Sequence, residues 1–130
     1  MSVIINGSSG ITTNAGGLVN PSTNIEGINY ACRAWVNFDG TTSPPTIRGS
    51  GNVTSVTRAA TGDYTITFTN AMPDANYAIT GTSAVSATGA VARIVSPVPA
   101  DIATGSLRIR TSNDTGVFEN GSVISIAIFR

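Results

Sequence analysis

The chain has 130 residues, with seven Arg against seven Asp plus Glu and no Lys, His or Gln. This length suits one domain with a short appendage, and the net charge of zero disfavours nucleic acid and anionic membranes as partners. Without His or Lys, the chain lacks the residues for a Ser-His-Asp triad, a Schiff base or a P-loop. We therefore expect no enzyme, no cofactor and no metal site, and the absence of a long apolar stretch predicts no membrane insertion.

The remaining composition favours β-structure. Ser, Thr, Asn and Gly together make up 57 of the 130 residues, and Val plus Ile number 25 against two Leu. β-Branched residues, Gly and Asn all disfavour helices, whereas they suit strands joined by tight turns. The fold class predicted is all-β.

Residues 1–28 differ from the rest and are predicted to form an extended N-terminal arm with one small hairpin. A short apolar run at residues 3–5 is followed by a turn cluster and a second short run at 11–13, with no alternation long enough to close a core. Such an arm needs a surface to lie against, so we expect docking or oligomer contacts there, at Ile4, Ile5 and Ile11. The alternative is an ordinary edge strand of the same domain.

From residue 29 onward the pattern predicts an antiparallel β-sandwich or jelly-roll-like knob domain. Strands 53–57 and 64–69 are expected to form one hairpin, and strands 106–111 and 123–130 to form another at the end of the chain. A Pro-Val-Pro sequence at 97–99 is expected to break a strand. The seven strands are predicted at residues 30–38, 53–57, 64–69, 77–82, 91–96, 106–110 and 123–130.

The first of these strands alternates between two faces. Its apolar face is predicted to hold the only cysteine as core filler, in the set Tyr30, Cys32, Ala34, Val36 and Phe38. Trp35, the only tryptophan, falls on the opposite face. We expect Trp35 to be covered by the other sheet, the arm or another subunit; the alternative is an exposed platform for stacking a sugar.

Four aspartates lie in turn-like contexts, and two hypotheses arise from them. Calcium would need several oxygen ligands at regular spacing, which is missing, so side-chain bonding within turns is favoured for Asp63, Asp74, Asp101 and Asp114. Asp114 and Glu119 are near enough in sequence to suggest a glycosidase pair, but their Asn- and Gly-rich surroundings favour solvated turn residues.

Two segments, 112–116 and 119–121, are rich in small polar residues. Loops of this kind tolerate change and carry binding functions. We expect them to form an exposed tip that faces a receptor, through Asn113, Asp114 and Asn120.

Several segments resemble the C-terminal domains of tail fibres from tailed bacteriophages. They are AWVNFDGT (34–41), IR (47–48), NVTSV (52–56), GDYTITF (62–68) and AMPDANYA (71–78). The resemblance covers about residues 30–80, and the opening IINGSSGIT (4–12) is similar to a segment found upstream in such fibres.

This resemblance implies a virion structural protein, made in the host cytoplasm, that forms a homotrimer. It would be a short tail-fibre or tail-tip-like component that docks on other tail or capsid proteins and contacts a host surface glycan or protein. An alternative within the class is a capsid decoration or head fibre protein. From another class, a carbohydrate-binding β-sandwich module would also suit the polar β surface.

Overall fold

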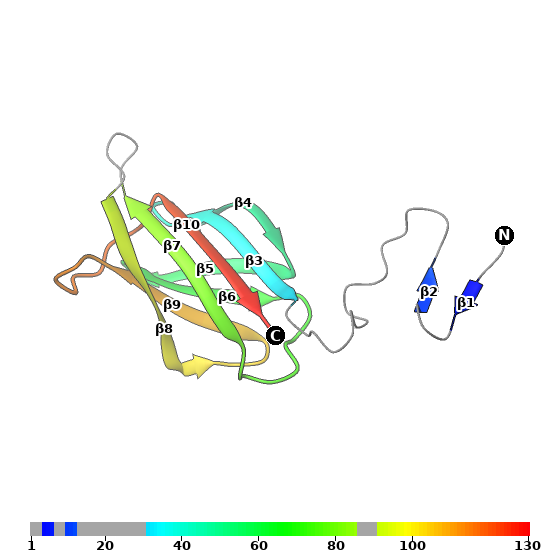
Figure 1. The fold of residues 1–130 in the computed structure, drawn as a ribbon. Coiled ribbons are helices and arrows are strands. Elements are labelled where there is room, and N and C mark those ends of the chain that lie inside the picture. Colours follow the sequence, from blue (N-terminus) through cyan, green and yellow to red (C-terminus); the bar gives the residue numbers. More distant parts are fainter. Residues whose placement is uncertain (1–3, 7–9, 13–30, 86–90) are drawn as a thin grey trace. The chain divides into compact units, whose positions relative to one another are not determined.

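A computed structural model describes residues 4–6, 10–12, 31–85 and 91–130. The chain divides into two compact units, Met1–Ala31 and Cys32–Arg130 (Figure 1). In the first unit, β1 (Ile4–Asn6) pairs antiparallel with β2 (Gly10–Thr12), and Ile5 lies opposite Ile11. These two strands form the small hairpin predicted for the arm.

The second unit is built from eight antiparallel strands, which confirms the predicted all-β class. In sheet order they run β4-β3-β10-β7-β8-β9-β6-β5. Their bounds are β3 (Cys32–Asp39), β4 (Thr46–Gly51), β5 (Val53–Ala60), β6 (Asp63–Phe68), β7 (Ala78–Val85), β8 (Val91–Ile102), β9 (Ser106–Ser112) and β10 (Val123–Phe129). The described residues include no helix able to span a membrane.

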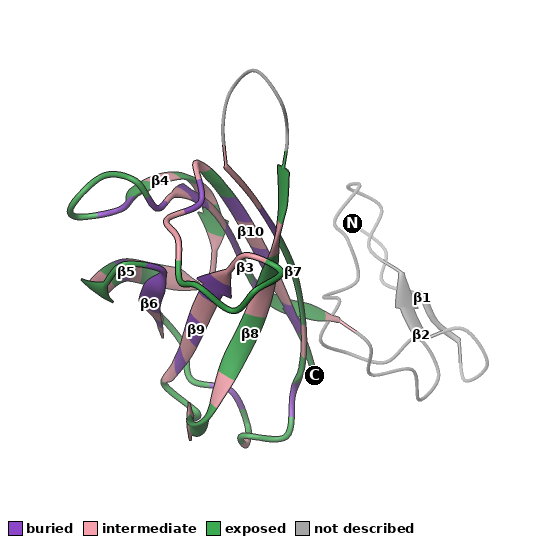
Figure 2. Cartoon of the chain, turned by 90° about the vertical axis from the view of Figure 1, so that its left-hand side faces the viewer, coloured by how far each residue is buried: buried purple, intermediate pink, exposed green. Residues whose placement is uncertain are grey.

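The long strand β8 joins two layers of this sheet into a sandwich. Its first residues, 91–93, pair with β7, and its later residues pair with β9. One layer therefore holds β4, β3, β10 and β7, and the other holds β9, β6 and β5. Buried residues alternate with partly exposed ones along strands such as β9, as expected for strands with one face on a core (Figure 2).

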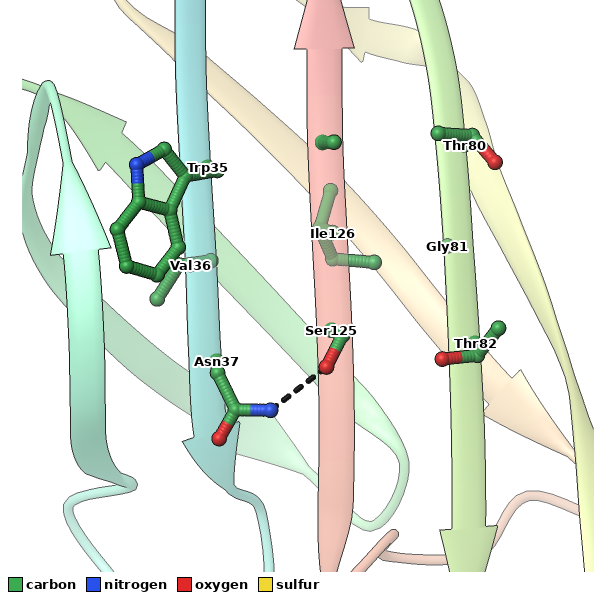
Figure 3. Close-up of a pocket in the computed structure, with 9 residues that line it drawn as sticks. Trp35, Val36, Asn37, Thr80, Gly81, Thr82, Ser125 and Ile126 are labelled. Carbon is green, nitrogen blue, oxygen red and sulfur yellow. Dashed lines mark hydrogen bonds between the residues drawn. The ribbon is translucent and has the colours of Figure 1, made fainter.

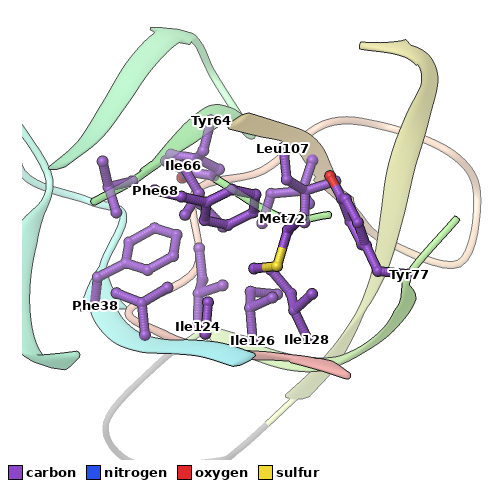
Figure 4. Packing of buried hydrophobic residues seen from close by; sticks show 14 residues of the cluster. Phe38, Tyr64, Ile66, Phe68, Met72, Tyr77, Leu107, Ile124, Ile126 and Ile128 are labelled. Atoms are coloured by element: carbon purple, nitrogen blue, oxygen red, sulfur yellow. The ribbon is translucent and has the colours of Figure 1, made fainter. Parts of the chain in front are cut away.

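Alternating inward side chains from both layers fill the core. Phe38 from one layer meets Tyr64 from the other edge-on, with ring centroids 5.3 Å apart, and Ile66 and Leu107 face Ile126 across the same interior (Figure 4). The buried hydrophobic set is Ala34, Val36, Phe38, Val56, Tyr64, Ile66, Phe68, Met72, Tyr77, Leu107, Ile109, Ile124, Ile126 and Ile128. The predicted inward faces of 30–38 and 64–69 are thus confirmed from Ala34 onward and at Tyr64, Ile66 and Phe68.

The predicted final hairpin is wrong. Strand β9 pairs with β6 and β8, whereas β10 pairs with β3 and β7. The connection between β9 and β10, residues 113–122, is long enough to cross from one layer to the other, so the two strands contribute to opposite sides of the core.

Two further differences involve glycine and proline. The edge strand β4 was not predicted, because its sequence TIRGSG has no apolar alternation. Strand β8 continues through Pro97 and Pro99, with an irregularity in its pairing between Pro97 and Ile102. Such an irregularity is where a strand tolerates proline.

The prediction that Cys32 fills the core is also wrong, since Cys32 is exposed. It begins β3, and the register with β10 shifts between Ile128 and Phe129, opposite this end of the strand. Inward alternation therefore starts only at Ala34.

Candidate functional site: the outer face of β3, β10 and β7

The outer face of the β3–β10–β7 layer carries a set of uncharged side chains in two rows. Cross-strand pairing aligns Trp35, Ala127 and Thr80 in one row. The next row aligns Asn37, Ser125 and Thr82. Because residues directly opposite one another share a face, these six residues form one continuous surface (Figure 3). We call it the Trp35 face.

Trp35 lies over the edge strand rather than upright on the sheet. Figure 3 looks onto the outer face, and the indole is seen flat beside β3 on the side of β4. Two glycines of β4 provide the space: a Cβ on Gly51 would lie 2.4 Å from the indole Nε1, and one on Gly49 would lie 3.2 Å from Cη2. The side chain of any other residue at position 51 would displace the ring.

The indole is left open to ligands. Trp35 is 46% exposed, so its covering by the other sheet, one of the predicted possibilities, is wrong. Covering by the arm or by another subunit stays a prediction. An aromatic ring held flat with one face free is a surface on which another flat or ring-shaped group can stack.

Polar groups lie beside the ring. The amide nitrogen of Asn37 donates to the hydroxyl of Ser125 at 2.6 Å, which fixes the orientation of the amide and turns its oxygen away from Ser125 (Figure 3). The Ser125 oxygen accepts this bond, so its own hydrogen remains to be donated elsewhere. Thr80 and Thr82 add two exposed hydroxyl-bearing side chains on β7.

Together these residues line a shallow groove of about 400 Å³. Small residues, Ala127 and Ser125, form its floor on β10 between the indole and the threonines. The volume lies at the lower end of the range, about 300–1,000 Å³, that is usual for small-molecule sites. The groove could therefore hold one or two sugar-sized rings.

The charged groups near this face are held by partners of their own. At one end, Arg33 donates to the backbone carbonyl of Arg130 at 3.0 Å. At the other, Arg48 pairs with Asp39 at 3.0 Å. The hydroxyl and backbone N–H of Thr41 donate to the Asp39 carboxylate and are the main cause of its lowered pKa. The groove between them is neutral.

The outer face of the other layer carries charged side chains that form ion pairs with one another. The Asp63 carboxylate accepts two bonds from Arg108, at 2.7 and 2.8 Å, and one from Arg110 at 3.2 Å. Arg108 also pairs with Asp101 at 2.9 Å. The hydrogen bonds from Arg108 are the first cause of the lowered pKa of Asp63, which is buried. This cluster is a structural arrangement in which each carboxylate is already bound by a guanidinium.

The loop between β9 and β10 contains the predicted receptor-facing residues, and their roles differ. Asp114 is exposed. The side-chain oxygen of Asn113 accepts bonds from the backbone N–H of Thr115 and Val117, at 3.1 and 2.8 Å, and so organises the turn. Receptor contact by these two residues stays a prediction.

Asn120 is instead a structural residue at the closed end of the sandwich. Its side-chain oxygen lies 2.8 Å from both the Gly62 N–H and the Tyr64 hydroxyl, which donate to it. Burial raises the pKa of Tyr64, so this hydroxyl stays a donor at ordinary pH. Asn120 is only partly exposed, and its side chain is committed to the fold.

Two further carboxylates also have protein partners. Glu119 pairs with Arg93, and Asp74 pairs with Arg130. Asp74 also accepts from the backbone N–H of Asn76 at 2.7 Å, the turn bonding predicted for it. Among the described residues, no group of three or more His, Cys, Asp or Glu side chains could hold a metal ion.

The predicted docking residues of the arm, Ile4, Ile5 and Ile11, lie in the β1–β2 hairpin. Their contacts with other proteins stay a prediction. Sequence reasoning placed Trp35 and Asn37 on one face of their strand but missed Ser125, Thr80 and Thr82 as neighbours on adjacent strands. Their outward alternation was readable, but which strands lie side by side was not.

No known protein family, curated protein or solved structure matches the chain.

Proposed function

We propose that this protein is a non-enzymatic structural component of a tailed-bacteriophage particle. In this proposal it is a short tail-fibre or tail-tip-like protein, with an arm that docks on the particle and a β-sandwich domain that contacts the host surface. The resemblance of residues 30–80 to tail-fibre domains supports the class of protein.

The observation that carries the binding role is the contrast between the Trp35 face and the charged groups. Every arginine of the domain donates to an acceptor within the domain, so the charges serve the scaffold. On the Trp35 face the indole is 46% exposed, and the Asn37–Ser125 bond still leaves the amide oxygen and the hydroxyl hydrogen available to a ligand. A rigid scaffold that presents an open neutral surface suits binding better than acid–base chemistry, which needs titratable groups with access to a substrate.

Imaging of purified phage particles tests this proposal directly. The chain would carry a small C-terminal label, and labelled particles would be examined by electron microscopy. We expect the label at the distal end of the tail. A label spread over the head would favour a capsid decoration or head fibre instead, and particles without the protein would contradict the proposal.

The assembly state provides a second test. The resemblance to tail fibres implies a homotrimer, so sedimentation equilibrium should give about three times the 13.2 kDa of one chain. A mass of one chain would contradict the trimer and would favour the monomeric alternative.

Removal of residues 1–28 separates the roles of the two units. Because the buried hydrophobic residues that the structure describes all lie between Ala34 and Ile128, the truncated protein should fold, and it should no longer attach to particles. A truncated protein that fails to fold would show that the arm is an integral part of the domain.

A carbohydrate-binding module is the second candidate, and the flat indole beside hydroxyl and amide groups favours it. This candidate shares the binding face with the first. It differs in needing neither a particle nor a trimer.

A further inference from the structure

We propose that the Trp35 face is a binding site for a neutral saccharide. The proposal deepens the proposed function, because it names the ligand class of the host-contacting surface. It rests on three features of the groove: the position of the indole, the polar groups around it and the absence of charge.

The indole is positioned as a stacking platform. Gly49 and Gly51 let the ring lie against β4, within distances that leave no room for a Cβ at position 51. Trp35 nevertheless stays 46% exposed. The C–H-rich face of a pyranose ring is apolar, so it gains contact area and dispersion energy on such a surface.

The groups next to the indole match the rim of a sugar ring. Saccharide hydroxyls both donate and accept hydrogen bonds. The groove offers an acceptor in the Asn37 amide oxygen, a donor in the Ser125 hydroxyl, and groups of both kinds in Thr80 and Thr82. The Asn37–Ser125 bond orients two of these groups before a ligand arrives, which lowers the entropy cost of binding.

Charge selects against acidic and basic ligands. The six residues of the Trp35 face carry no ionisable group, and the arginines and aspartate at its two ends are engaged by Arg130 and by each other. A ligand charge placed among these six residues would lose hydration without an ionic partner there, since the exposed Arg33 lies at one end of the face. A neutral saccharide has no such cost.

A second copy of the chain is a less suitable occupant. Stable protein interfaces bury about 800 Å² per partner, with cores rich in aromatic and other large side chains. The Trp35 face has one large apolar side chain among three hydroxyls, one amide and a methyl group. Its volume and chemistry suit a small polar ring better than a protein core.

The test uses the purified full-length protein and an immobilised panel of neutral mono- and oligosaccharides built from glucose, galactose, mannose, rhamnose and N-acetylglucosamine. Sialylated and uronic-acid glycans serve as the acidic comparison. Saccharides that bind are then titrated in solution while the fluorescence of Trp35 is recorded, since this is the only tryptophan. We expect saturable binding of at least one neutral saccharide with a change in the indole emission.

Two variants test the geometry. Gly51→Val should displace the indole and weaken binding by about tenfold or more, which corresponds to about 1.4 kcal/mol. Ser125→Ala should also weaken binding, by a smaller factor, while it keeps the size of the side chain nearly constant. The matched control is Gly105→Ala, because a Cβ there meets no atom within 4 Å; it should bind as the unaltered protein does.

Several outcomes would overturn the proposal. They are a failure to bind any neutral saccharide, binding that Gly51→Val and Ser125→Ala leave unchanged, or binding of acidic glycans alone. If the protein binds no saccharide and the same two variants dissociate an oligomer, the Trp35 face is a contact between copies of the chain. Because the test needs no particle, saccharide binding by a protein absent from virions would refute the phage role and leave this inference standing.

Discussion

The two outer faces of the sandwich are built alike but have opposite chemistry. On the β9–β6–β5 layer, Asp63 is buried beneath Arg108 and Arg110, and the charges satisfy one another. On the β3–β10–β7 layer, Trp35 lies open among uncharged groups. The comparison teaches that a surface whose polar groups are paired internally contributes to stability, whereas one whose groups remain accessible can bind a partner. Changes on the first face should therefore lower stability, and changes on the second should lower binding.

The largest effect is expected from removing the central carboxylate of the charged face. Asp63→Ala leaves Arg108 and Arg110 without their shared acceptor, although Arg108 keeps its bond to Asp101. Because the remaining arginines are about one third exposed, no charge is left buried alone, and the lost hydrogen bonds to charged groups should cost about 2–3 kcal/mol. Urea unfolding of Asp63→Ala and of the exposed-residue control Asp114→Ala measures this. Equal stability of the two variants would contradict a structural role for the cluster.

The same carboxylate should make the protein sensitive to acid. The pKa of Asp63 is lowered in the folded state, so the unfolded state binds the proton more readily. The stabilisation is present above the ordinary aspartate pKa of about 4 and is lost as the pH falls through the lowered folded value.

The free energy of unfolding should therefore decrease less between pH 7 and pH 2 for Asp63→Asn than for the unaltered protein. Part of the decline should persist in the variant, because the pKa values of Asp39 and Asp74 are lowered as well. Parallel curves for the two proteins would show that Asp63 does not contribute to the acid response.

A smaller effect is expected at the loop between β9 and β10. Asn120→Ala removes the acceptor of the Gly62 N–H and one of the two acceptors of the Tyr64 hydroxyl, which also lies 3.1 Å from the Gly40 carbonyl, so we expect a loss of about 1–2 kcal/mol. Asp114→Ala, on the same loop and exposed, should stay within about 0.5 kcal/mol. Thermal unfolding of the two variants measures the difference. If Asn120→Ala does not change stability, Asn120 is again a candidate for receptor contact.

The smallest effect on stability is expected on the neutral face. Trp35→Ala should cost about 1 kcal/mol, because almost half of the residue is already exposed and only the remainder loses burial. Its effect on saccharide binding should be much larger than its effect on unfolding. A loss of several kcal/mol would show that the indole serves the fold instead.

The sequence predicted the fold class because β-branched alternation is a local property. The alternation predicted which side chains of β3 and β6 point inward, and residues such as Val36 and Ile66 are indeed buried. The pairing of β10 with β3 and β7 could not be predicted, since pairing depends on where a ten-residue connection leads. The binding face was only half predicted for the same reason. Trp35 was placed on the outward face of its strand, although it was expected to be covered, whereas Ser125 and Thr82 join Asn37 through pairs between distant segments.

Chemical-shift mapping of the isotope-labelled protein during titration with a neutral saccharide tests the contrast between the two faces most directly. The largest shifts should occur at the indole N–H of Trp35 and the side-chain amide of Asn37. The guanidinium Nε–H signals of Arg108 and Arg110 should stay in place and serve as the control on the opposite face. Shifts centred on those arginines or on the 112–116 loop, or no shifts at all, would contradict the assignment of the Trp35 face as the binding surface.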